Sequence, residues 1–378
     1  MRATQVDTPD VAPQADCAPG APHPRDTARL IGQGAAEAAF LDAYNSGRLH
    51  HAWLITGPRG VGKATLAWRI ARFLLAEPAG DGLFGAPPPP GTLDVSPDDP
   101  VAHRIAALSE PGLHLIRRPW DQKTGKHAAQ ITVDTVRGLN NFFHMSAADG
   151  GRRVVIVDAA DDMNTSAANA LLKLLEEPPA NATLLLIAHQ PSRLLPTIRS
   201  RCRELRCATL GAQDLAEALA QTGVEVPDAG SLSALAAGSV GEALRLTTMG
   251  GTDIYHEITA LFATLPRLDR QKALRLAESC AGKQNADRFD LMLRLFDLFL
   301  ARLARTGAGA PPVVEAAPGE TALLTRLAPG PDAGRAWAEM QQSLSARAQH
   351  GRAVNLDPAA LILDMILKVN ETASRVAA

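Results

Sequence analysis

A glycine-rich segment of nine residues carries the clearest chemical signal in the chain. It fits the pattern G-x-x-x-x-G-K and comprises Gly57, Pro58, Arg59, Gly60, Val61, Gly62, Lys63, Ala64 and Thr65. It lies between a short apolar run and a stretch with helical spacing of apolar residues. In such a loop the backbone N–H groups wrap a phosphate, the lysine reaches the terminal phosphates and the helix start adds its positive end. The segment predicts a nucleotide-phosphate site; the alternative is an ordinary turn between a strand and a helix.

The residue after the lysine departs from the pattern of an ATP-hydrolysing enzyme. A Ser or Thr hydroxyl normally holds Mg²⁺ at this position, but here it is Ala64. Thr65 follows, yet one residue is a rotation of about 100° around a helix, so its hydroxyl should point elsewhere. We therefore expect ATP, if it binds at all, to bind weakly in a vestigial site.

A second element of a nucleotide site, an apolar strand that ends in an acid, is present at Asp158. In hydrolysing enzymes a Glu usually comes next and polarises the attacking water, whereas this chain has Ala159. The following acids, Asp161 and Asp162, are expected to cap the segment that follows them. With both the hydroxyl and the glutamate missing, we expect hydrolysis of ATP by the chain alone to be absent or very weak.

The elements that would position these residues alternate along the first half of the chain. Apolar runs at 52–56, 114–118, 152–160 and 182–189 predict strands, and the segments between them carry helical patterns. This order is typical of a parallel sheet covered on both faces. After about residue 207 only helices are expected. The fold class is therefore α/β. We expect a disordered tail at 1–25 and a nucleotide-binding-like domain at 26–207, followed by a small helical domain at 208–252 and an all-helical C-terminal domain at 253–378.

Composition limits the function further. The 378 residues suggest two or three domains. The 46% hydrophobic and 21% charged residues exclude a wholly disordered chain, and the net charge of −2 is not that of a generally basic nucleic-acid binder. The four cysteines have no C-x-x-C spacing, so no zinc or redox site is expected. No membrane-spanning run or secretory signal is visible, which favours the cytoplasm.

A basic segment at 193–206 contains five arginines, namely Arg193, Arg199, Arg201, Arg203 and Arg206. Such a segment forms either a solvated basic face or a set of phosphate contacts. The residues alone leave both alternatives open.

Several motifs together resemble one family. Ser200-Arg201-Cys202 is similar to the S-R-C motif of AAA+ clamp-loader subunits, and ANALLKLLEEPP at 168–179, RLHHAWLITGPRGVGK at 48–63 and LIGQ at 30–33 also match that family. Within the family, the chain most resembles the delta-prime group of the bacterial DNA polymerase III clamp loader. The resemblance covers about residues 28–250 and extends weakly to 355–369.

The resemblance implies an AAA+ P-loop domain, a helical lid and a helical collar in a pentameric ring that places a sliding clamp on primed DNA. Implied partners are the motor (gamma/tau) and delta subunits, with the sliding clamp and primed DNA reached through the complex; no membrane is involved. It implies that Arg201 is an arginine finger for a neighbour's ATP, and that Gly32 and Gln33 lie beside the base. The family's second sensor arginine is replaced by Gly241.

Two departures and two alternatives accompany the resemblance. The zinc module of many clamp-loader subunits would fall at 78–112, which has no cysteine, so a thiolate zinc site cannot form there.

An active ATPase motor subunit of the same ring is the first alternative to a stator. An unrelated P-loop enzyme such as a nucleotide kinase is the second. The C-terminal helices are expected to mediate assembly, although the apolar stripe at 291–303 would equally fit an intrachain core.

Overall fold

The computed structural model describes residues 14–17, 21–27, 29–76, 89–145, 151–224 and 228–377. The chain forms two compact units: Met1–Thr222 with Ser239–Gly241, and Gly223–Gly238 with Glu242–Ala378. Each is described by itself. The separate lid at 208–252 stays a prediction. Much of the proline-rich segment at 78–100 lies outside the described residues, as does the first half of the predicted tail.

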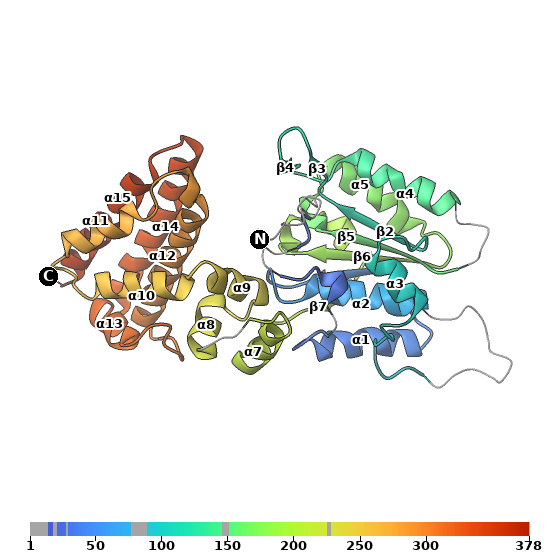
Figure 1. Ribbon diagram of the computed structural model, residues 1–378, viewed down its shortest axis with the longest axis horizontal. Helices are drawn as coiled ribbons and strands as arrows, with labels where there is room; N and C mark the ends of the chain where they lie inside the picture. Colours follow the sequence, from blue (N-terminus) through green and yellow to red (C-terminus); the bar gives the residue numbers. More distant parts are fainter. Residues whose placement is uncertain are drawn as a thin grey trace, which may run out of the picture. The chain divides into compact units, whose positions relative to one another are not determined.

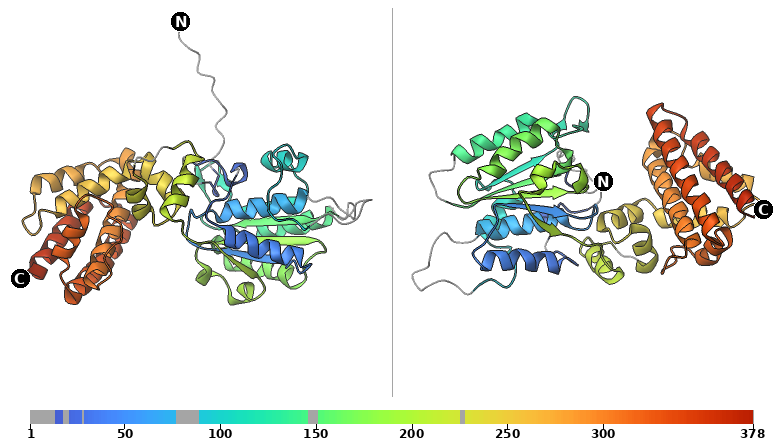
Figure 2. Two further views of the ribbon diagram at one scale, coloured as in Figure 1. Left: turned by 90° about the horizontal axis from the view of Figure 1, so that it is seen from below. Right: turned by 180° about the vertical axis from the view of Figure 1, so that it is seen from behind.

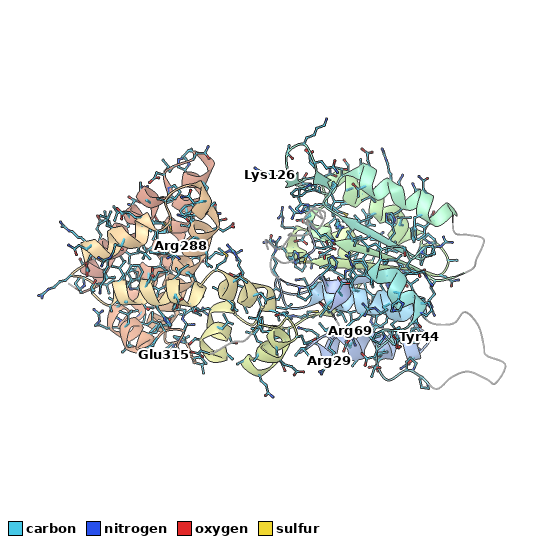
Figure 3. The ribbon with its side chains drawn as sticks, viewed as in Figure 1. Arg29, Tyr44, Arg69, Lys126, Arg288 and Glu315 are labelled. Atoms are coloured by element: carbon cyan, nitrogen blue, oxygen red, sulfur yellow. The ribbon has the colours of Figure 1, made fainter. Side chains whose placement is uncertain are left out.

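A five-stranded parallel sheet organises the first unit. Its strands follow the order β2 (Leu113–Arg117), β5 (Arg153–Asp158), β6 (Ala182–Ala188), β1 (Ala52–Thr56) and β7 (Arg203–Arg206). This confirms the predicted α/β class and four of its strands. β7 was not predicted, and neither were the two-residue strands β3 (Trp120–Asp121) and β4 (Lys126–His127). β3 and β4 pair with each other as a hairpin. Lys126 lies in this hairpin (Figure 3).

Helices cover both faces of the sheet (Figure 1). One face carries α1 (Gly34–Asn45), α2 (Lys63–Ala76) and α3 (Pro100–Ala106), whereas the other carries α4 (Val133–Met145) and α5 (Thr165–Glu176). The same two layers are seen from behind (Figure 2). The strands between them are apolar because both faces are buried.

Local signals explain where α5 begins and ends. The side chain of Asn164 accepts a hydrogen bond from the N–H of Ala167, which caps the helix start. Pro178 and Pro179 follow its end and cannot continue a helix.

On the other face, the buried Arg69 of α2 joins its layer to α1 through Glu37 at 2.7 Å (Figure 3). Short elements complete the unit: the 3₁₀ turns Pro24–Asp26, Ala160–Asp162 and Pro191–Arg193, and the helices α6 (Pro196–Arg199) and α7 (Ala212–Ala220).

The second unit is helical throughout its described residues. Its helices are α8 (Ala229–Ala236), α9 (Val240–Thr248, which begins in the first unit), α10 (Gly251–Phe262), α11 (Arg270–Glu278), α12 (Ala286–Gly307), α13 (Glu320–Leu327), α14 (Pro331–Ala353) and α15 (Pro358–Ala377). The apolar stripe at 291–303 lies on α12 and is buried against the unit's own helices. No helix in the described parts of the chain is long and apolar enough to cross a membrane.

A buried polar cluster ties three of these helices together. The Glu320 carboxylate of α13 is fully buried and accepts hydrogen bonds from Arg302 Nε at 2.7 Å, from the Tyr255 hydroxyl at 2.5 Å and from the Ala316 N–H at 2.6 Å. Because each partner is satisfied by the same carboxylate, the cluster must form as a whole.

Glu320→Ala should therefore destabilise the second unit by roughly 3–5 kcal/mol, since it leaves the buried Arg302 without its counter-charge. Urea unfolding followed by circular dichroism measures the loss. Glu278→Ala, at an exposed position, is the matched control and should change stability little. An equal effect of both variants would show that the cluster contributes nothing special.

Candidate functional site

The predicted phosphate loop lies directly after β1 and leads into α2 at Lys63. Gly57 has a φ of +138°, and a Cβ there would lie 2.4 Å from the carbonyl oxygen of Cys207. Only glycine fits this turn. Ala64 and Thr65 lie in the first turn of α2 and are partly exposed, and Val61 is buried beside them.

Lys63 bonds to its own loop. Its ammonium donates to the carbonyl oxygens of Gly57 at 2.7 Å and Pro58 at 2.5 Å, and the residue is only 3% exposed. Burial lowers the pKa of Lys63 to about 8, and the charge of Arg59 lowers it further, whereas Cys207 and Asp158 raise it. The amine that should meet a phosphate is therefore occupied by the loop backbone in this structure.

The segment Ser239–Gly241 covers the middle of the loop. The N–H of Gly241 donates to the carbonyl oxygen of Gly60 at 3.2 Å. A Cβ on Gly60 would lie 2.3 Å from the Ser239 hydroxyl and 2.9 Å from the Gly241 nitrogen, and Gly60 has a φ of +73°. Gly241, which stands at the position of the expected sensor arginine, thus packs against Gly60 of the loop.

Asp158 ends β5 in a buried position, as the sequence analysis expected for the acidic strand end. Burial raises the pKa of Asp158 to about 7, and the charge of Asp16 raises it further, while Lys63 opposes both. The Asp158 carboxyl is therefore partly protonated near neutral pH.

Asp16 reaches this edge of the sheet from the N-terminal segment, inside the range assigned to a disordered tail. Its side chain is fully buried and accepts hydrogen bonds from Arg117 Nη1 at 2.5 Å and from His23 at 3.2 Å. Arg117 is the register partner of Asp158 on β2. The described part of the range 1–25 comprises residues 14–17 and 21–25. Within it, Asp16 contacts Arg117 of the sheet strand β2.

The two acids after Asp158 do not cap the following segment, the helix α5, so that expectation was wrong. Asn164 caps α5 instead. Asp161 accepts hydrogen bonds from the N–H groups of His189 and Gln190 at 3.0 and 3.1 Å, which fixes the end of β6. Asp162 pairs with Arg118 at 3.0 Å.

His189 was not predicted as a site residue, although it directly follows β6, the strand that pairs with β5 next to Asp158. Burial and the positive charges of Lys63 and Arg59 lower its pKa to about 4, so the ring is neutral near pH 7. Its Nδ1 atom is buried without a hydrogen-bond partner among the described residues. The sequence does offer a signal for this residue: a histidine that follows an apolar strand of the domain that also carries the predicted phosphate loop.

Gln33 has a structural role in this conformation. Its amide donates to the carbonyl oxygens of Val61 and Ala208 at 2.9 and 2.8 Å and accepts from the Ala208 N–H at 2.9 Å. These bonds tie the phosphate loop to the segment after β7.

Arg201 lies just before β7, on the surface. Its Nη1 donates to the carbonyl oxygen of Thr197 at 3.1 Å, and its Nη2 is 2.9 Å from the carboxylate of Glu176. The structure does not bring Arg201 together with the phosphate loop. Because β7 starts at Arg203, opposite Trp53, Arg201 is at the amino end of the sheet, whereas the loop follows Thr56 at the carboxyl end.

The other residues of the basic segment are mostly exposed. Arg203 stacks its guanidinium over the Trp53 ring, 5.1 Å from the centroid, and Arg199 is exposed on α6. Cys202 and Cys207 are partly and fully buried, as expected, and burial raises the pKa of each thiol, to about 12 and about 11. Neither thiol is therefore a reactive thiolate near neutral pH.

Comparison with known proteins finds similarity to DNA polymerase III subunits. Residues 32–211 match a family profile described as "DNA polymerase III, delta subunit". The chain is 38% identical over 232 residues to DNA polymerase III subunit delta' of Pseudomonas aeruginosa. This alignment covers 61% of this chain and 65% of that protein. It is 36% identical over 166 residues to subunit delta' of Escherichia coli, covering 43% and 44%. The chain is thus similar to delta-prime subunits of DNA polymerase III over parts of its length.

More distant similarities surround this match. Subunit gamma/tau of Mycobacterium bovis is 32% identical over 219 residues, covering 54% of this chain and 33% of the relative. A gamma subunit-related protein of Thermotoga maritima of known structure is 15% identical with a TM-score of 0.42, covering 88% and 99%. The aligned segments span less than two thirds of these curated relatives' own lengths.

The raised pKa of Asp158 predicts a pH-dependent cost of folding. Because the folded carboxyl binds its proton more tightly than the unfolded one, stability is fullest below pH 3.8 and is lost as the pH rises through about 7. The loss from this group is on the order of 4 kcal/mol.

Asp158→Asn cannot ionise, so it should raise the free energy of unfolding relative to the parent chain more at pH 8 than at pH 5. Chemical denaturation at the two pH values measures the difference, with Asp98→Asn at an exposed site as the control. A gain that is the same at both pH values would contradict the prediction.

Proposed function

We propose that this chain is a delta-prime-like stator subunit of the replicative DNA polymerase clamp loader, which supports ATP-dependent loading of the sliding clamp onto primed DNA. In this role Arg201 acts in trans, as an arginine finger for the ATP of a neighbouring motor subunit. The observation that carries the proposal is that Arg201 lies at the amino end of the sheet and the chain's own phosphate loop at the carboxyl end. A guanidinium at that end can meet a nucleotide only on another subunit.

The state of the chain's own site supports the stator role. Lys63 is bonded to loop carbonyls, Ala64 lacks the metal-holding hydroxyl and Ala159 lacks the water-orienting carboxylate. Gly241 packs on Gly60, where a motor subunit would carry its sensor arginine. ATP binding by this chain would therefore be weak or vestigial.

An active motor subunit of the same complex is the second candidate, favoured by the intact Gly62-Lys63 pair and by the similarity to gamma/tau subunits. It requires that other residues take over the roles of the three missing groups at Ala64, Ala159 and Gly241. The stator interpretation requires no such replacement, and for that reason we prefer it.

The proposed partners are the gamma/tau and delta subunits, with the sliding clamp and primed DNA reached through the assembled complex, in the cytoplasm. The helices of residues 253–378 would mediate assembly through surfaces other than the stripe of α12, because that stripe already packs inside the second unit.

We expect the isolated chain not to hydrolyse ATP at a useful rate, with or without primed DNA. The low end for working phosphoryl-transfer enzymes is about 1 s⁻¹. A phosphate-release assay checks this, and turnover near that value would favour the motor alternative. Ala64→Thr should not restore activity, because it returns the metal-holding hydroxyl but leaves Ala159 in place of the glutamate.

Arg201→Ala should leave the chain folded and able to enter the complex, yet lower the DNA-stimulated ATPase and clamp loading of that complex. An arginine finger contributes about 10³–10⁵ in rate at the site that it serves, and planar bidentate contacts make Lys a poor substitute. Arg199→Ala, two residues away and also exposed, is the control and should cost much less. Normal ATPase and loading with Arg201→Ala would return Arg201 to the ordinary surface arginines.

A further inference from the structure

The guanidinium of Arg201 is held from two sides by different elements. Nη1 donates to the carbonyl oxygen of Thr197 in α6, and Nη2 lies 2.9 Å from Oε1 of Glu176, the last residue of α5. Two contacts to two nitrogens of a planar group define its direction, which a single contact would not. They use two of the five donors of the guanidinium.

Glu176 projects from a fixed point of the backbone. Its neighbour Leu175 belongs to the core of the first unit, and the carbonyl oxygen of Leu175 is 3.1 Å from Nε2 of His51, which precedes β1. The N–H of Glu177 closes the end of α5 on the carbonyl oxygen of Lys173 at 3.0 Å. The carboxylate that meets Arg201 is thus anchored through α5 to the sheet.

The strength of the pair suits a side chain that must change partners. The Arg201 side chain is 37% exposed and that of Glu176 is 51% exposed, and ion pairs of this kind contribute about 0–1 kcal/mol. Glu176 also lies at the negative end of α5, which favours a cation there. A phosphate group, with more negative charge, would displace or share the contact at small cost.

We propose that Glu176 is a positioning residue for Arg201, which holds the guanidinium in the direction from which it reaches the phosphates of a neighbouring subunit. This inference rests on the proposed function, since it assigns Glu176 a task only if Arg201 acts in trans. Glu176 itself touches neither nucleotide nor reacting atoms.

Three substitutions at the end of α5 test the assignment in the assembled complex. Glu176→Ala removes the contact, and it should not harm folding because it deletes an acid at the negative end of a helix. Glu176→Gln keeps an acceptor oxygen at the same reach. Glu177→Ala removes the adjacent exposed carboxylate, whose side chain is not part of the Arg201 contacts, and serves as the matched control.

We expect Glu176→Ala to lower the kcat of the DNA-stimulated ATPase by about 3- to 10-fold, less than the roughly 100-fold cost of a full misplacement of a reacting group by 1 Å. The KM for ATP should stay within about twofold, because the neighbouring subunit binds the nucleotide. Loss of an interaction made only in the transition state lowers kcat without raising KM. Glu176→Gln should recover most of the lost kcat, and Glu177→Ala should behave as the parent.

A double substitution shows whether Glu176 acts through Arg201. In the Arg201→Ala background, adding Glu176→Ala should change the ATPase no further. A second readout needs no partner: phenylglyoxal labelling of the isolated chain, followed by peptide mass spectrometry, should modify Arg201 several-fold faster in Glu176→Ala than in Glu177→Ala.

The outcomes separate the two ideas. If Arg201→Ala leaves the complex unchanged, the proposed function fails, and the positioning role fails with it. If Arg201→Ala lowers the ATPase but Glu176→Ala matches Glu177→Ala, only the positioning role is wrong. A further loss from Glu176→Ala in the Arg201→Ala background would also overturn it, because Glu176 would then act by another route.

Discussion

The direction of the strands is the constraint on which the rest of the first unit depends. In a parallel sheet every carboxyl end lies at one edge and every amino end at the other. The phosphate loop follows the carboxyl end of β1, while the residues that precede β7, including Arg201, are at the amino end. The strands between them are buried and continuous, so the two groups cannot approach one another within one copy of the chain.

A closed hydrogen-bond system occupies the carboxyl edge. Lys63 bonds to its own loop, Gly241 bonds to Gly60, and the carboxyl of Asp158 has a raised pKa beside the buried Asp16. Polar groups of the loop thus pair with the protein's own backbone at this edge, namely Lys63 with Gly57 and Pro58, and Gly241 with Gly60.

Sequence reasoning recovered what short-range patterns encode. The buried strands, the phosphate loop and Asp158 follow from apolar runs and glycine spacing within a few residues. β7 was not predicted because three of its four residues are charged and exposed, and the single buried Leu205 makes no apolar run. Asp16 and Arg117 are 101 residues apart in the chain, and the Arg201 contact to Glu176 depends on how α6 packs beside the end of α5. Such contacts depend on the tertiary fold, so the local sequence does not reveal them.

Under the proposed function, the separation of the two edges would let the fold lose ATP hydrolysis at one edge and keep the arginine at the other. Residues of the phosphate site come from the loop after β1, the end of β5 and the segment Ser239–Gly241, whereas Arg201 is held by α6 and the end of α5. The two sets share no side chain, and substitutions at sites without shared partners act nearly independently. Under the proposed function, changes such as Ala64, Ala159 and Gly241 therefore remove hydrolysis without disturbing the arginine. The α5 helix, about 18 Å long, still anchors Glu176 at the far end, because its packing depends on the core and not on nucleotide.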